Sequence, residues 1–210
     1  TSKFPLWLVS GPNTAPMSTA SNEVIILGAG IGGLTLALSL HQAGIACRVY
    51  EAVPELRPLG VGINLLPHAV RELSELGLLE ALDRVGVRTQ EAVFFTEHGQ
   101  LVFREPAGRH AGYDWPQYSI HRGDLQTVLL EETLKRLGPD SVRCGHRCTG
   151  VEQDDAGVTV HFADGRAPVR GAVAIGCDGI HSALRKQLYP NEGAPRYSGC
   201  LLYTSPSPRD

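Results

Sequence analysis

The sequence predicts an α/β fold in which a parallel βαβ unit opens the ordered chain and antiparallel strands follow it. An apolar run at Val24–Leu27 leads directly into a glycine-rich turn and an apolar helical segment, and a β-rich stretch at 46–51 closes the unit. Further along, three β-rich stretches at 146–153, 157–165 and 167–179 are separated by Asp/Gly turns and predict a three-stranded antiparallel meander. The pattern favours a parallel sheet with an added β layer.

The segments between these units alternate helical and β patterns. Pro67 starts an amphipathic stretch that glycines at 77 and 86 divide into two short helices. A His-Gly turn joins two apolar runs over 92–105 and predicts a hairpin. Residues 117–120 form a short predicted strand that leads into a helix over 122–138, where leucines make an apolar stripe.

Composition favours a small-molecule partner. The 210 residues carry a formal net charge of -3, with 22 acidic and 19 basic residues, and no basic stripe that would bind nucleic acid or a membrane surface. No apolar run approaches the roughly eighteen residues of a membrane span. The five cysteines form no CxxC pair and the histidines have no metal-binding spacing, so we expect reduced thiols, a cytoplasmic location and no metal site.

Both ends of the sequence differ from the part between them. Residues 1–16 predict a non-native or disordered leader, with a signal peptide as the weaker alternative, and Met17 is the expected native start. Residues 200–210 are similar to a translated transposon end and sequencing adapter. The alternative interpretation is a flexible tail rich in Ser and Pro. We therefore expect a native fragment over 17–199, in which strands at about 90–120 begin a substrate domain.

The glycine turn predicts a dinucleotide site. Gly28, Gly30 and Gly33 fit G-x-G-x-x-G between a strand and a helix, as in a Rossmann-like fold. Glycine allows the tight turn at the first position, approach of a pyrophosphate at the second and close helix packing at the third. Glu51, at the end of the second strand, is placed to bind ribose hydroxyls and disfavours a 2′-phosphate. The turn alone does not distinguish NAD from FAD.

A second motif, "GCDGIHSALR", resembles the Asp-Gly motif of the single-component flavoprotein aromatic hydroxylases, which include para-hydroxybenzoate and salicylate hydroxylases. The resemblance implies an FAD-binding domain and places Asp178 where FAD and the nicotinamide nucleotide meet. An acidic turn residue is the alternative interpretation of Asp178. Its position after an apolar strand and before a predicted helix favours the cofactor site.

Three more segments extend the resemblance. In "SIHRGDLQTVLL" it implies that Arg122 contacts the flavin, which suits the fixed hydrogen-bond geometry of a guanidinium. In "ELRPLGVGIN" it implies that Gly60 and Gly62 pass beside the flavin ring and that Arg57 reaches the ring or the nucleotide. In "GHRCTGVEQ" it implies that the main chain of Cys148 touches the adenine end, whereas its side chain is expected to pack inertly.

The resemblance implies a monooxygenase with FAD as cofactor, NADH or NADPH as reductant, and O2 and a small aromatic or heteroaromatic compound as substrates. It implies hydroxylation through a flavin C4a-hydroperoxide, so no side chain is assigned as catalytic. Within the family, the motifs are similar to those of phenazine-modifying members. The alternatives are an epoxidase, halogenase or reductase on the same scaffold, or an NAD-dependent dehydrogenase. Because the later flavin motif of the family is absent, we expect the fragment to bind FAD weakly and to be inactive.

Overall fold

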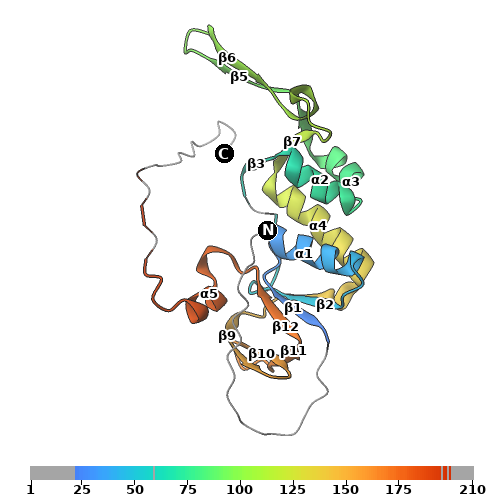
Figure 1. The fold of residues 1–210 in the computed structure, drawn as a ribbon, viewed down its shortest axis with the longest axis vertical. Coiled ribbons are helices and arrows are strands. Elements are labelled where there is room, and N and C mark those ends of the chain that lie inside the picture. Colours follow the sequence, from blue (N-terminus) through green and yellow to red (C-terminus); the bar gives the residue numbers. More distant parts are fainter. Residues whose placement is uncertain (1–21, 59, 195, 198, 200–210) are drawn as a thin grey trace.

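The structure is a computed structural model that describes residues 22–58, 60–194, 196–197 and 199 (Figure 1). The sequence-based expectations for residues 1–16 and 200–210 lie outside the described residues.

A four-stranded parallel sheet forms the base of the fold, in the order β12-β1-β2-β8. The predicted βαβ unit is confirmed, and its apolar runs supply the buried strands of this sheet. The βαβ unit consists of β1 (Val24–Leu27), α1 (Ile31–Gln42) and β2 (Cys47–Tyr50). The other two strands of the sheet are β8 (Val142–Arg143) and β12 (Val173–Gly176).

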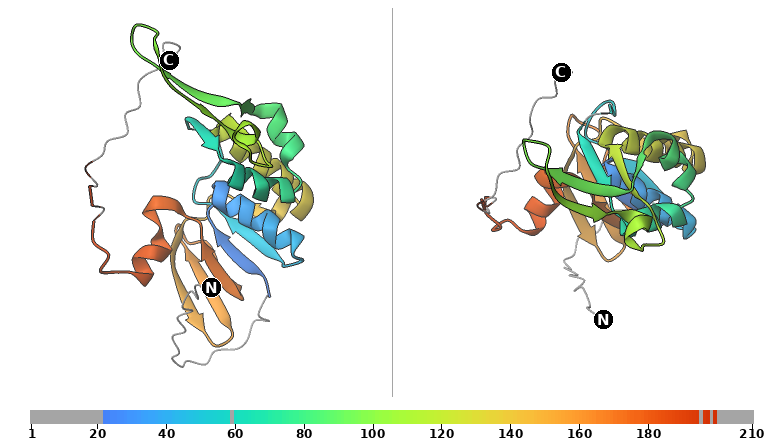
Figure 2. Two further views of the ribbon diagram at one scale, coloured as in Figure 1. Left: turned by 45° about the horizontal axis from the view of Figure 1, so that its top comes forward. Right: turned by 90° about the horizontal axis from the view of Figure 1, so that it is seen from above.

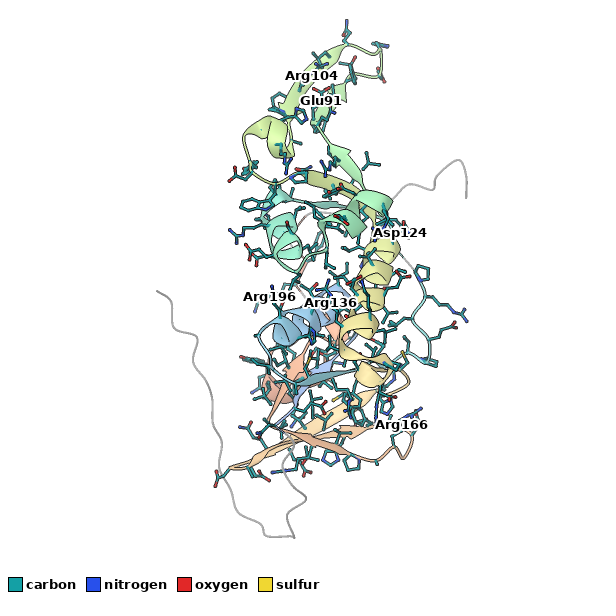
Figure 3. All side chains as sticks on the ribbon, turned by 90° about the vertical axis from the view of Figure 1, so that its right-hand side faces the viewer. Glu91, Arg104, Asp124, Arg136, Arg166 and Arg196 are labelled. Carbon is teal, nitrogen blue, oxygen red and sulfur yellow. The ribbon has the colours of Figure 1, made fainter. Side chains whose placement is uncertain are left out.

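The second sheet is antiparallel, has the order β3-β7-β4 and lies beside the helices. The predicted helix pair and the long helix are confirmed, and their leucines join one core with α1. Arg136 of α4 donates to the carbonyl of Leu76 at 2.8 Å and so ties α4 to the end of α2 (Figure 3). The bounds are β3 (Gly62–Leu65), α2 (Pro67–Glu75), α3 (Leu79–Val85), β4 (Val87–Thr89), β7 (Gln117–His121) and α4 (Arg122–Leu137).

The predicted meander is present as a third sheet, in the order β11-β10-β9, with one correction. The stretch 167–179 is not a single strand of the meander. It divides near Ala172, whose N–H donates to the carbonyl of Glu23 at 3.0 Å, and its second part runs as β12 beside β1 in the parallel sheet. The bounds are β9 (Cys148–Asp154), β10 (Gly157–Phe162) and β11 (Val169–Gly171).

The predicted hairpin is confirmed as β5 (Glu91–Phe95) and β6 (Leu101–Pro106), which project away from the helices (Figures 1 and 2). Glu91 and Arg104 pair across it at 3.4 Å (Figure 3). Its phenylalanines are more than half exposed. Three short 3-10 turns, η1 (Gly108–Ala111), η2 (Pro139–Ser141) and η3 (Gly179–His181), and the helix α5 (Ala183–Leu188) complete the described chain.

We predict opposite effects on stability at two neighbouring glycines of α1. A Cβ at Gly33 would lie 1.9 Å from the carbonyl oxygen of Gly28, so Gly33→Ala should lower the free energy of unfolding by about 1–3 kcal/mol. A Cβ at Gly32 meets nothing within 4 Å, so Gly32→Ala should raise that free energy by about 0.5–1 kcal/mol through helix propensity. Urea unfolding of both variants checks this, and equal effects would contradict it.

Candidate functional site

The glycine turn brings α1 against the ends of β1 and β12. Gly28 has a φ of 104°, its N–H donates to the Tyr50 carbonyl at 2.8 Å, and a Cβ there would lie 2.4 Å from the Cys177 carbonyl oxygen. Gly33 is in equally close contact with Gly28, whereas a Cβ at Gly30 would meet nothing within 4 Å. Two of the three glycines therefore serve packing, and the middle one leaves open space where the sequence predicts a pyrophosphate.

Glu51 holds the turn in place from the end of β2. Its Oε2 accepts a hydrogen bond from the Ala29 N–H at 2.7 Å, and its Oε1 accepts one from the Val53 N–H at 2.9 Å. A carboxylate has about four lone-pair directions. Glu51 thus keeps accepting capacity for ribose hydroxyls while these two bonds fix its orientation, and ribose binding by Glu51 stays a prediction.

A cavity of about 540 Å³ opens at the carboxyl ends of β1 and β2, beside the start of α1. This is the edge at which open α/β sheets bind nucleotides. The structure brings six of the nine predicted site residues to its wall. The lining consists of Gly28, Gly30, Ile31, Gly32, Glu51, Ala52, Val53, Glu55, Leu56, Arg57, Arg122, Gln126, Cys177, Asp178 and Gly179.

Arg122 reaches this wall because the loop before β3 crosses the start of α4. Gly60, with a φ of 135°, lies so close that an added Cβ would be 3.1 Å from the Cβ of Arg122. A Cβ at Gly123 would lie 2.8 Å from Pro58. Both glycines are therefore needed for the loop to pass. The carbonyl of Val61 also accepts a hydrogen bond from the Arg122 N–H at 3.0 Å.

Asp178, which follows β12, also lines the cavity. Its Oδ2 accepts a hydrogen bond from the Ala183 N–H at 2.8 Å. Its Oδ1 is buried and has no hydrogen-bond partner among the described residues. A buried acceptor without a partner is costly. A ligand with a donor group, such as a ribose or ribityl hydroxyl, would satisfy it, and this fits a flavin nucleotide in the cavity.

The remaining predicted residues are placed less directly. Arg57 lines the cavity but is exposed and paired with Glu55, with N···O distances of 2.9 and 3.0 Å. Gly33 acts through packing, and Gly62 pairs with His121 in the β3-β7 ladder; neither lines the cavity. Cys148 also lies outside the lining, at the start of β9, where burial raises the pKa of its thiol.

Gln126 also lines the cavity, and no sequence motif predicted it. Its Nε2 donates to the carbonyl of Ala29 at 2.8 Å, across 97 residues of sequence. The one available signal was its position four residues after Arg122, which places both side chains on the same face of a helix.

A second cavity, of about 630 Å³, lies at the start of α2 on a different part of the molecule. Arg71 and Trp115 line it, with the guanidinium carbon 5.9 Å from the centre of the indole ring. No residue of the glycine turn contributes to it. Within the described part of the chain, no cluster of three or more potential metal ligands is present, and no helix there is long and apolar enough to cross a membrane.

Comparisons with known proteins show the family to which the chain belongs. The family described as "FAD binding domain" matches residues 21–197. The phenazine 1,6-dicarboxylic acid hydroxylase of Lysobacter antibioticus is 44% identical over 83% of this chain and 45% of its own length. The FAD-dependent urate hydroxylase of Klebsiella pneumoniae is 35% identical over 84% of this chain and 45% of its own. The chain thus spans about half the length of these curated relatives.

Solved structures give the same result for the fold. Klebsiella pneumoniae HpxO in complex with FAD and uric acid superposes with a TM-score of 0.66 at 34% sequence identity. The superposition covers 79% of this chain and 41% of that protein. The family resemblance seen in the motifs is therefore confirmed.

We predict slow alkylation of Cys177, which lines the cavity. Burial first, and the nearby Asp178 carboxylate second, raise the pKa of its thiol, so the thiolate fraction at pH 8 is smaller than in an unfolded chain. Peptide mass spectrometry after iodoacetamide treatment should show slower labelling in the folded chain than in urea, with a rate that rises only at higher pH. Equal rates in the two states would contradict the burial of this thiol.

Proposed function

The chain belongs to the FAD binding domain family, and we propose that it forms the FAD-binding part of a monooxygenase that hydroxylates a small aromatic or heteroaromatic compound with NAD(P)H and O2. One observation carries the proposal: a single cavity gathers Gly30, Glu51, Arg122 and Asp178 from four separate segments. The relatives that share this part of the chain include a phenazine dicarboxylic acid hydroxylase and a urate hydroxylase. The names of these relatives supply the substrate class.

Different residues of the cavity suit different parts of the cofactor. The open space at Gly30 and the free N–H groups at the start of α1 suit the pyrophosphate. Glu51 suits the adenosine ribose, because its carboxylate is already oriented by two backbone N–H groups. Arg122 supplies a positive charge for flavin or phosphate oxygens. Asp178 accepts a hydroxyl hydrogen at its unpartnered Oδ1.

Bound FAD would supply the chemistry by which O2 is activated. The protein must then bind the cofactor, orient the aromatic ring and exclude water. The described residues perform the first of these tasks, and hydrogen bonds from Glu51 and Gln126 to the backbone of Ala29 hold the turn in shape. We also place the protein in the cytoplasm, because the four described cysteines are free thiols.

A dehydrogenase is the less favoured function. In the parallel sheet, β2 is followed by β8, a two-residue strand that the chain reaches only after the β3-β7-β4 sheet and α4. A second βαβ set, which a nicotinamide-binding Rossmann domain would need, does not continue from β2 in the described residues.

We predict that Gly30→Val separates cofactor binding from folding. The new side chain enters open space, so the unfolding free energy should fall only by the about 1 kcal/mol that valine costs at an N-cap, whereas the side chain fills the place proposed for the pyrophosphate. FAD affinity, measured by quenching of flavin fluorescence, should fall at least about tenfold. Ser39→Val is the matched control, because it adds valine to the exposed face of the same helix. Unchanged FAD affinity in Gly30→Val would contradict the assignment.

We further predict that these 210 residues alone bind FAD weakly and show no substrate-stimulated oxidation of NADH. The relatives contain roughly as much sequence again, and an aromatic substrate needs walls on both sides of the flavin. Absorbance of the purified chain in the flavin bands and an NADH oxidation assay check this. Stoichiometric flavin together with substrate-stimulated NADH oxidation would show that the described half is sufficient.

A further inference from the structure

The β3-β7-β4 sheet has two unlike faces. On one face, Tyr118 and Ile120 of β7 are buried in the core formed with the helices. On the other face lie the exposed side chains of Asn64 and Ser119, which are direct partners in the β3-β7 register, and the half-buried Thr89 of β4. The second face is not covered by other described elements at Asn64 and Ser119.

The three polar side chains form one hydrogen-bonded row. Ser119 Oγ donates to Asn64 Oδ1 at 2.9 Å, and Thr89 Oγ1 lies 2.9 Å from Ser119 Oγ. A hydroxyl has a single hydrogen. Since Ser119 uses its hydrogen on Asn64, Thr89 must donate to Ser119. The row therefore has a direction, and it ends in the Nδ2 group of Asn64, whose two N–H donors have no partner among the described residues.

Strand β7, which carries Ser119, ends beside the FAD cavity. His121 lies two residues after Ser119 on β7, about 7 Å along the strand. Its ring Nε2 lies 2.9 Å from the carbonyl oxygen of Gly60, in the loop that passes Arg122. Arg122 itself follows His121 directly and lines the cavity. His121 thus links the strand that carries Ser119 to the loop at the cavity wall, and the residues of the row themselves lie outside the cavity lining.

We propose that Asn64 is a substrate-binding residue whose Nδ2 group donates to a carboxylate, ring nitrogen or oxo oxygen of the aromatic substrate. Ser119 and Thr89 are positioning residues, because their hydrogen bonds fix the carboxamide with its donors outward. The inference rests on the proposed function and deepens it: the substrate is an aromatic compound with a hydrogen-bond acceptor on its ring edge, and a plain hydrocarbon edge would leave the donors unpaired.

The test uses the protein encoded by the native reading frame that contains this chain, with FAD bound. Two probes differ in one group: 4-hydroxybenzoate has a carboxylate where 4-methylphenol has a methyl group. Their dissociation constants are measured from changes in flavin absorbance. In Asn64→Leu we expect binding of 4-hydroxybenzoate to weaken about tenfold and that of 4-methylphenol to change less than about twofold. Asn191→Leu, on an exposed segment after α5, is the matched control and should change neither.

Two variants of Ser119 distinguish a positioning role from a general loss of structure. Ser119→Ala removes the hydrogen that fixes Asn64 and should weaken 4-hydroxybenzoate selectively, whereas Ser119→Thr keeps a hydroxyl and should restore binding. Equal changes for both probes, or no change in Asn64→Leu, would overturn the inference while leaving the proposed function intact. A native protein that holds no FAD, or whose flavin responds to neither probe, would overturn the proposed function itself.

Discussion

The contact between α1 and β1 is the constraint on which the rest of the site depends. At Gly33 the helix lies against the carbonyl of Gly28, where an added Cβ would be only 1.9 Å from the oxygen. This approach directs the start of α1 to the carboxyl edge of the parallel sheet. The unpaired N–H groups of the first helical turn therefore lie at the edge where β1 and β2 end and where the cavity opens.

Side chains from two other elements complete the turn. Both backbone groups of Ala29 are used: its N–H donates to Glu51, and its carbonyl accepts from Gln126 of α4. A turn fixed from β2 on one side and α4 on the other pays little conformational entropy when a nucleotide binds. The residue that recognises ribose in our proposal is thus also one that holds the phosphate-binding turn in shape, so folding and cofactor recognition share the same hydrogen bonds.

Local sequence patterns predicted most helices and strands, but they did not predict contacts between residues that are far apart in the sequence. Val24–Leu27 matches β1 because a buried parallel strand reads as a continuous apolar run. The division of 167–179 was missed because both parts are β-rich. The crossing between sheets is marked by contacts with the carbonyl of Glu23, which accepts from the Ala172 N–H and would lie 2.6 Å from a Cβ at Gly171. Gln126 was missed for a similar reason, since its partner lies 97 residues away. Gly62 lies in strand β3 and outside the cavity lining, and its contact with the flavin ring stays a prediction.

A crystal structure of the FAD-loaded native protein would show directly where the cofactor binds. We expect the pyrophosphate beside Gly30 at the start of α1, the adenosine ribose on the Glu51 carboxylate and a flavin or ribityl hydroxyl on Asp178 Oδ1. FAD bound elsewhere, for instance in the cavity beside Trp115, with the cavity at the glycine turn left empty, would contradict the central claim that this turn binds the cofactor.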